Sequence, residues 1–148
     1  MKFLTTPLVL FVVCLGAMLL LGSVWPIARF LHSPWKYGGC AALLAGLFFC
    51  GAGALRIVRK RTTLEPFGQP ACLITSGVFR YSRHPIYLGF TLMLAGAWAL
   101  TGAVSAGLPA IAFVVVVDRF YIRFEEKTLA AKFGLDYDKY RRKTRRWI

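Results

Sequence analysis

The stretch PIYLGFTLMLAGAWALTGAVSAGLPAIAFVVVV, residues 85–117, decides the fold, because it is apolar throughout and carries no charged side chain. It is too long for one bilayer crossing, since a spanning helix needs about 20 mostly apolar residues with a rise of about 1.5 Å each. Thr101 and Gly102 interrupt the block near its middle, and glycine is a frequent turn residue. The stretch therefore predicts two helices joined by a tight turn.

Two further apolar stretches lie upstream, at residues 7–24 and 37–58, and each has the length of a single crossing. The first could instead be a signal peptide that starts at Lys2, but its apolar run exceeds the usual length of about 7–15 residues and no convincing cleavage site follows. The hydrophobic fraction of 57% also exceeds the roughly 45–50% of soluble domains. The sequence thus predicts an all-α integral membrane bundle of about four transmembrane helices.

The net charge of +13 is concentrated on one side of this bundle. Of the 19 Lys and Arg residues, only Arg29 and Lys36 fall on the side that holds the first hairpin loop. The rest fall on the side of Lys2, of the loop after the second helix and of the segment after the fourth helix. Basic residues accumulate on the cytoplasmic side of membrane proteins, so both termini are expected to be cytoplasmic. This distribution favours contact with anionic membrane lipids and argues against binding of nucleic acid.

One membrane domain is expected over residues 1–148. Its parts are two scaffold helices (1–58), a cytoplasmic loop (59–84), a transmembrane hairpin (85–123) and a cytoplasmic tail (124–148).

Two local patterns refine this division. In the second helix, Gly46 and the cluster Gly51-Ala52-Gly53 favour close packing against another helix. In the tail, apolar and aromatic residues recur every three or four positions, which predicts an amphipathic helix or helix pair on the membrane surface. Gly134 interrupts this pattern and is expected to be a helix C-cap.

The polar residues that could support chemistry lie at the two ends of the hairpin. His84-Pro85 precedes the third helix, where Pro85 suits the first helical turn and moves His84 into a cap position. Glu125-Glu126 follows the fourth helix. Because the hairpin turns near Gly102, both groups are expected at the same depth, facing each other in a polar pocket. Taken singly, a histidine at a helix start is more often a cap, and a glutamate pair is more often a solvated turn.

Four motifs in order carry a resemblance to a known family: TSGVFRY (75–81), RHPxYxG (83–89), EExxL (125–129) and FGxxYxxY (133–140). With these motifs, residues 62–148 resemble the isoprenylcysteine carboxyl methyltransferase and phospholipid methyltransferase family of integral membrane methyltransferases. The resemblance implies an S-adenosylmethionine-dependent methyltransferase that takes its cofactor from the cytosol. It also implies a lipophilic acceptor that arrives from the bilayer.

The resemblance also implies which residues bind the cofactor. Aromatic and apolar groups can enclose adenine, a carboxylate can accept both ribose hydroxyls, and a histidine or the N–H groups of a helix start can hold the cofactor's carboxylate. No metal is expected. The cofactor-binding positions implied are Leu73, Ile74, Phe79, His84, Pro85, Ile86, Tyr87 and Glu125.

The candidate catalytic residues are Arg83, His84, Arg119 and Arg123. The family places a substrate-binding arginine four residues before the pocket glutamate, but Tyr121 stands there in this chain, with Arg119 and Arg123 two residues to either side. The acceptor therefore stays open. An arginine could orient a carboxylate acceptor, and a carboxylate or His84 could take the proton of an amine.

Other functions remain to be weighed against this interpretation. One is a phospholipid or small-molecule N-methyltransferase, and another is a non-catalytic membrane adaptor that holds lipid through its basic tail and binds no S-adenosylmethionine. A small transporter is disfavoured, because the predicted spans carry essentially no ionisable residues between their ends. The sequence leaves the oligomeric state open.

Overall fold

The structure, a computed structural model, describes residues 5–28, 37–60 and 71–148. Most of these residues are helical, and no strand occurs among them, which confirms the all-α prediction. The elements are α1 (Thr5–Val24), α2 (Gly38–Arg59), the 3-10 helix η2 (Gly77–Arg80), α3 (Pro85–Thr101), the 3-10 helix η3 (Ser105–Gly107), α4 (Leu108–Val116), the π-helix η4 (Val117–Ile122) and α5 (Arg123–Lys143).

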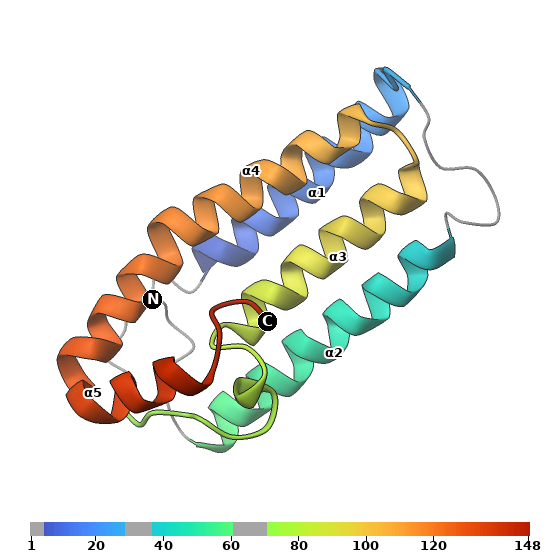
Figure 1. Ribbon diagram of the computed structural model, residues 1–148. Coiled ribbons are helices and arrows are strands. Elements are labelled where there is room, and N and C mark those ends of the chain that lie inside the picture. The colour runs from blue at the N-terminus through green and yellow to red at the C-terminus, as the bar shows by residue number, and fades with distance from the viewer. Residues whose placement is uncertain (1–4, 29–36, 61–70) are drawn as a thin grey trace.

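The long helices lie side by side as a bundle, and α4 runs on through η4 into α5 (Figure 1). Within the described ranges, three stretches are long and apolar enough to cross a membrane: Pro7–Val24, Gly38–Arg59 and Ser105–Lys143. The fourth expected crossing corresponds to α3, which is apolar but shorter. The chain is therefore a helical membrane protein.

The turn between α3 and α4 lies where the sequence predicts it. Gly102 adopts a left-handed backbone conformation with φ of 65°, and its N–H donates to the Trp98 carbonyl at 3.0 Å. The Trp98 indole donates to the Ala103 carbonyl at 2.8 Å. Ser105 then donates to the Trp25 carbonyl at 2.7 Å and ties the turn to the chain that follows α1. Positive φ favours glycine, so Gly102 suits this reversal.

Glycines hold α2 and α3 close together. Gly39, Gly46 and Gly53 are the buried residues of α2. A Cβ added to Gly46 would stand 2.6 Å from the Gly89 carbonyl oxygen of α3, so the two backbones touch at this point. This confirms close packing through Gly46. Gly51 takes no part, because a Cβ there would meet no atom within 4 Å.

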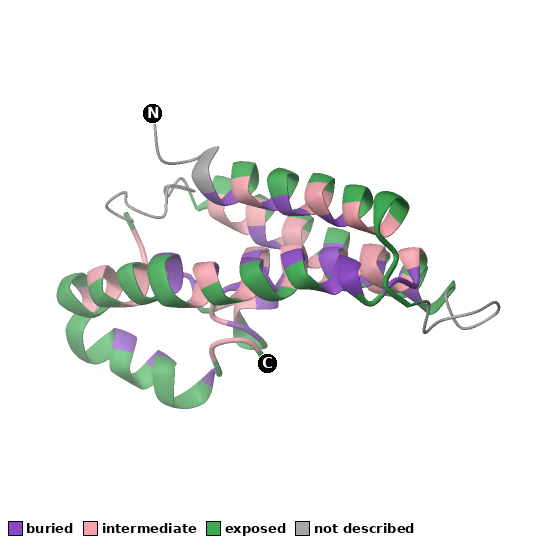
Figure 2. Ribbon diagram, turned by 90° about the horizontal axis from the view of Figure 1, so that it is seen from above, coloured by how far each residue is buried: buried purple, intermediate pink, exposed green. Residues whose placement is uncertain are grey.

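The other side of the bundle has an aromatic core. The Phe11 ring of α1 stacks on Phe90 of α3 with centroids 4.8 Å apart, and the Phe113 ring of α4 meets both edge-on at 6.3 Å. The outward faces of the helices are exposed along their length (Figure 2). On α1 these outward residues are apolar, as Leu20 and Val24 show with exposed fractions of 65% and 78%. Such a surface fits lipid.

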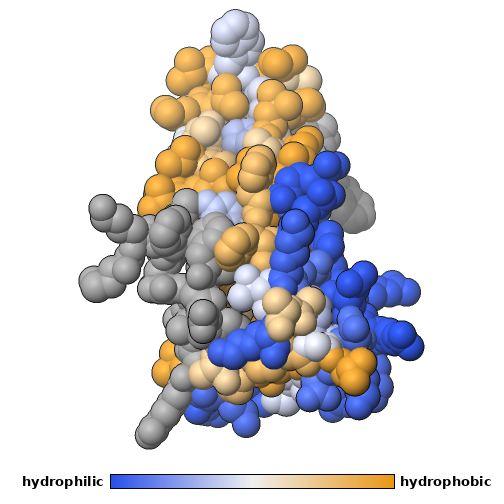
Figure 3. Space-filling view, turned by 90° about the vertical axis from the view of Figure 1, so that its left-hand side faces the viewer, coloured by the Kyte–Doolittle hydropathy of each residue, from blue (hydrophilic) through white to orange (hydrophobic). Residues whose placement is uncertain are grey.

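Polar residues gather at one end of the molecule, below an apolar band (Figure 3). This end holds η2, the start of α3 and the whole of α5 (Figure 1). Gly134, with φ of 48° and ψ of −121°, divides α5 into two helical segments and so ends the first one, as expected. The second segment and the chain after it fold back toward the start of α3 (Figure 1). That return brings the tail to the candidate site.

Candidate active site

His84 caps α3 with its backbone while its ring turns to other partners. Its φ of −127° and ψ of 62° are non-helical, and Pro85 follows in the first turn, as the sequence predicts. The His84 N–H donates to Ser82 Oγ at 3.2 Å, and the imidazole makes no cap hydrogen bond. The side chain is 2% exposed, so its surroundings determine its charge.

The α3–α4 hairpin brings His84 to the glutamate pair. His84 Nδ1 lies 3.5 Å from Glu125 Oε2, and Nε2 lies 3.5 Å from Glu126 Oε1. Burial lowers the pKa of His84, but the two carboxylates outweigh this effect and raise the pKa above its usual value. The two carboxylates therefore favour the cationic form of the ring.

Glu126 is the centre of an ion-pair network. Arg83 Nη1 lies 2.9 Å from Glu126 Oε1, and Arg146 Nη2 lies 2.6 Å from Glu126 Oε2. Arg83 also donates to the Tyr137 hydroxyl at 3.1 Å. The Glu126 side chain is 13% exposed, whereas that of Glu125 is 34% exposed. Both carboxylate oxygens of Glu126 thus contact side chains of the protein, whereas the Glu125 carboxylate remains accessible to a ligand.

The C-terminal tail completes this network. Arg146 pairs with Asp118 at 3.3 Å as well as with Glu126, and the Trp147 indole donates to Asp118 at 3.3 Å. The Arg83 N–H donates to the Arg145 carbonyl at 3.1 Å. Sequence reasoning missed Asp118, Arg146 and the central role of Glu126. The adjacent glutamates were visible in the sequence, but nothing in it shows where the tail returns.

The π-helix η4 places its inward side chains differently from an α-helix. Val117, Tyr121 and Ile122 are its buried residues. Single π-turns inside α-helices are frequent at functional sites. Tyr121, at the position where the resemblance implies an arginine, is 8% exposed and lies on the inward face. Arg119 and Arg123 are exposed, and neither belongs to the network of described contacts around Glu126.

The apolar positions implied for the cofactor divide between two faces. Tyr87 is buried and interacts with Glu125. Ile86 instead packs on α2, because a Cβ added to Gly53 would stand 2.9 Å from Ile86 Cγ1. Ile74 is buried at 8% exposure, and Leu73 and Phe79 are half-buried beside it in the chain. The Phe79 carbonyl accepts from the Tyr140 hydroxyl at 2.6 Å, which ties η2 to α5.

Two buried nitrogens at the site form no hydrogen bond with the described residues: Arg83 Nε, and His84 Nε2, which has only the 3.5 Å ion-pair contact with Glu126. Buried polar groups are nearly always hydrogen-bonded, so such exceptions call for a physical reason. Both are N–H donors on cationic side chains, and they suit an anionic oxygen of a ligand. The half-exposed Glu125 carboxylate beside them suits hydroxyl groups. These donors and acceptors fit the carboxylate and ribose of S-adenosylmethionine.

Comparison with known proteins gives the site a context. The model of the phospholipid methyltransferase family matches residues 35–136. Protein-S-isoprenylcysteine O-methyltransferase A of Arabidopsis thaliana is 43% identical over 72 residues, which cover 46% of this chain and 34% of the relative. The corresponding methyltransferase of Schizosaccharomyces pombe is 36% identical over 74 residues, which cover 48% of this chain and 30% of the relative.

A third relative, an uncharacterized protein of Haemophilus influenzae, is 42% identical over 64 residues, which cover 43% of this chain and all of the relative. The chain thus spans about a third of the length of the two curated methyltransferases. No solved structure matches the chain.

Proposed function

The chain belongs to the phospholipid methyltransferase family, and on this basis we propose that it transfers a methyl group from S-adenosylmethionine to a lipophilic acceptor in the membrane. The observation that carries the proposal is the buried cluster of His84, Arg83 and the glutamate pair at the polar end of an apolar bundle. Polar clusters of this kind are costly next to lipid and are usually functional. Two N–H donors of this cluster form no hydrogen bond with the described residues.

S-adenosylmethionine, when bound, would supply an activated methyl group on a positively charged sulfur. We assign its carboxylate to the donors of Arg83 and His84, its ribose hydroxyls to Glu125, and its adenine to the apolar side chains of Leu73, Ile74 and Phe79. Pro85, Ile86 and Tyr87 would form the adjoining helix start. Glu126 would act as a positioning residue, because it holds Arg83 through the 2.9 Å ion pair.

The protein's own contribution to catalysis would be alignment and exclusion of water. Orientation of two reactants can lower a barrier by several kcal/mol, and by about 7–11 in the best intramolecular cases. The elements that would provide it are the start of α3, η4 and the tail that closes over them (Figure 1). Direct displacement of the methyl group by the acceptor requires no covalent enzyme intermediate.

The acceptor determines which polar residues take part. For a carboxylate, we propose Arg119 or Arg123 as the orienting cation, because both are exposed while Arg83 is paired with Glu126. For an amine, we propose Glu125 as the proton acceptor, a role that would replace its contact with the ribose hydroxyls. His84 is less suited, since the neighbouring carboxylates raise its pKa and so favour its protonated form. The phospholipid and small-molecule N-methyltransferase alternatives belong to this second case.

We also propose that residues 1–148 form one methyltransferase domain, with the polar end of the bundle in the cytoplasm. The asymmetry of basic residues supports this orientation, because all but two of the 19 Lys and Arg residues fall on that side. The site would then open to the compartment in which the cofactor is made.

The test is titration of the detergent-purified protein with S-adenosylmethionine by calorimetry. We expect saturable binding that His84→Ala and Glu125→Ala weaken, while Asp136→Ala, which removes an 80% exposed acid from α5, leaves it unchanged. No binding at millimolar cofactor by folded protein would exclude the methyltransferase proposal and favour the adaptor. Unchanged affinity in Glu125→Ala would remove that residue from the site.

A further inference from the structure

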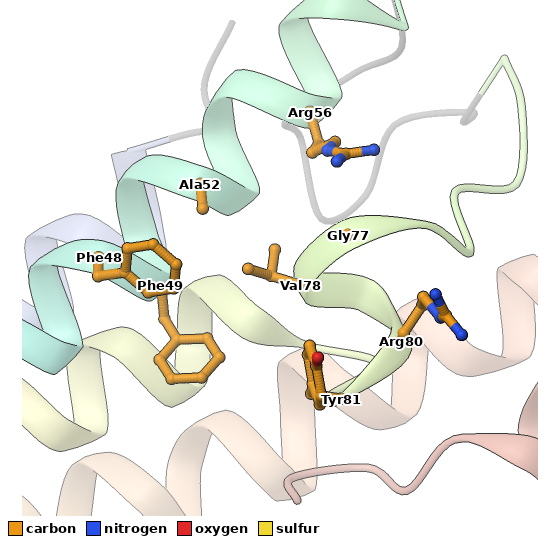
Figure 4. A pocket seen from close by; sticks show the side chains of 8 residues that line it. All are labelled: Phe48, Phe49, Ala52, Arg56, Gly77, Val78, Arg80 and Tyr81. Atoms are coloured by element: carbon orange, nitrogen blue, oxygen red, sulfur yellow. The ribbon is translucent and has the colours of Figure 1, made fainter.

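A cavity lies between α2 and η2, on a different set of residues from the polar cluster. Its volume is about 630 Å³. Figure 4 shows aromatic rings of α2 at one end and two guanidinium groups at the other. The lining residues are Phe48, Phe49, Ala52, Arg56, Gly77, Val78, Arg80 and Tyr81. None of these eight residues carries a carboxylate, so the cavity combines an apolar part with two positive charges that have no acidic partner in the lining.

The Arg56 side chain is fixed in place at the cavity wall. Its Nη1 donates to Ser76 Oγ at 3.0 Å. A Cβ added to Gly77 would stand 2.6 Å from Arg56 Cζ, so only a glycine leaves room for the guanidinium there. Gly77 also has a φ of 65°, which disfavours other residues. Since an arginine has five N–H donors, this arrangement leaves donors for a ligand.

Arg80 provides the second charge from η2. It is exposed, and in the described part of the chain its guanidinium forms no hydrogen bond or ion pair. The neighbouring Tyr81 ring is 70% exposed and also lines the cavity. Both arginines lie near the end of α2, where a membrane-spanning helix reaches the headgroup layer. Phe48, Phe49 and Ala52 lie one to two turns further into the apolar part of that helix.

We propose that this cavity binds an anionic membrane phospholipid, with the phosphate between Arg56 and Arg80 and an acyl chain along Phe48, Phe49 and Ala52. Arginine forms charge-assisted hydrogen bonds with phosphate, and its weak hydration favours this contact at an interface. The single negative charge of the phosphodiester would offset part of the charge of the two arginines. The lipid at this position is a bound membrane component, and its binding requires neither the cofactor nor methyl transfer.

The test is a lipid titration of the detergent-purified protein followed by native mass spectrometry. Dioleoyl phosphatidylglycerol is the probe, and dioleoyl phosphatidylcholine and inorganic phosphate are the comparison ligands. We expect phosphatidylglycerol to bind most tightly. Arg80→Gln and Arg56→Gln should each weaken it by about fivefold, the contribution of one basic side chain at an anionic membrane surface.

Two variants distinguish a built cavity from general charge attraction. Arg59→Gln removes an exposed charge from the same turn of α2 but not from the cavity, and it should leave the affinity unchanged. Ala52→Trp fills the apolar part, keeps both arginines and should abolish tight binding. Equal losses in Arg59→Gln, undiminished binding in Ala52→Trp, or equal affinity for phosphatidylcholine would each overturn the proposal. Binding of inorganic phosphate at the same affinity would also overturn it.

Discussion

Glu125 and Glu126 are neighbours in the sequence, but their surroundings differ. Glu126 pairs with Arg83 and Arg146, whereas the more exposed Glu125 lies near His84 and Tyr87. Glu126→Gln should therefore lower the free energy of unfolding by about 2–4 kcal/mol, because it leaves the buried Arg83 without its anion and Arg146 with Asp118 alone. Thermal or denaturant unfolding in detergent measures this change.

The matched control is Glu125→Gln, which removes the same charge one position away. It should lower the free energy of unfolding by less than about 1 kcal/mol, since Glu125 is 34% exposed and Glu126 still lies beside His84, while it weakens cofactor binding. Equal destabilisation by both variants would contradict the separation of a structural and a ligand-binding glutamate.

His84 makes stability depend on pH in a defined direction. Its pKa is raised in the folded protein, so the folded state binds the proton more tightly than the unfolded state does. The resulting stabilisation is complete below the unfolded pKa of about 6.5 and is lost as pH rises through the raised pKa. The melting temperature of the protein without cofactor should fall as pH increases through this window.

The control for this pH dependence is His84→Gln, which keeps a polar side chain and cannot titrate. Its melting temperature should vary less over the same pH range. A variant that retains the full pH dependence of the parent protein would show that other groups cause it.

At the scale of residues, the sequence predicts side-chain contacts that follow from the lengths of the two hairpin helices. It does not predict contacts that are made by the C-terminal tail. The distance of His84 and Glu125 from the turn at Gly102 is enough to place them together. The partners Asp118 and Arg146 are 28 residues apart and meet only because α5 kinks and the chain returns. No local pattern around Arg146 specifies that return, since the same basic run also fits a solvated tail.

At the scale of elements, the apolar lengths predict the helices and the turn, but not the contacts between helices. Small residues in α2 favour close packing, yet Gly46 and Gly53 meet α3 while Gly51 points into open space. The choice depends on which face of α2 turns inward, and an all-apolar helix gives little sign of its orientation. The π-turn of η4 was not predicted either, since its wider winding has no distinct composition.

The contact between α2 and α3 gives a test with a control on the same helix. Gly46→Ala places a methyl group 2.6 Å from both the Gly89 carbonyl oxygen and Met93 Cγ, so the helices must separate. We expect a loss of about 1–3 kcal/mol, the usual cost of overpacking. Unfolding in mixed detergent measures it. Gly51→Ala meets no atom within 4 Å and should be neutral or slightly stabilising, because alanine favours helix more than glycine does.

A smaller effect in Gly46→Ala than in Gly51→Ala would contradict the close approach of the two helices. The same pair of variants also bears on the candidate site. Since α3 begins at Pro85, displacement of α3 from α2 should shift the neighbouring His84, and Gly46→Ala should weaken cofactor binding along with stability.

At the scale of the whole molecule, the separation of apolar and charged surface connects the fold, the candidate site and the cavity between α2 and η2. The apolar surface covers most of the bundle, and the charged groups gather at the end where α5 lies (Figure 3). The His84 cluster and the Arg56–Arg80 cavity both lie at that end. A single orientation in the membrane would therefore expose both sites to the same compartment and the same leaflet.

That orientation can be measured with reporter fusions. Alkaline phosphatase is active only outside the cytoplasm, so a fusion after Ile148 should be inactive and a green fluorescent protein fusion at the same place should fluoresce. A phosphatase fusion after Ala28, just beyond α1, should be active. The physical reason is the excess of basic residues on the side of the α2–α3 loop and the tail, which resist translocation. Active phosphatase after Ile148 would place the site outside the cytoplasm, away from S-adenosylmethionine, and would contradict the proposed use of that cofactor.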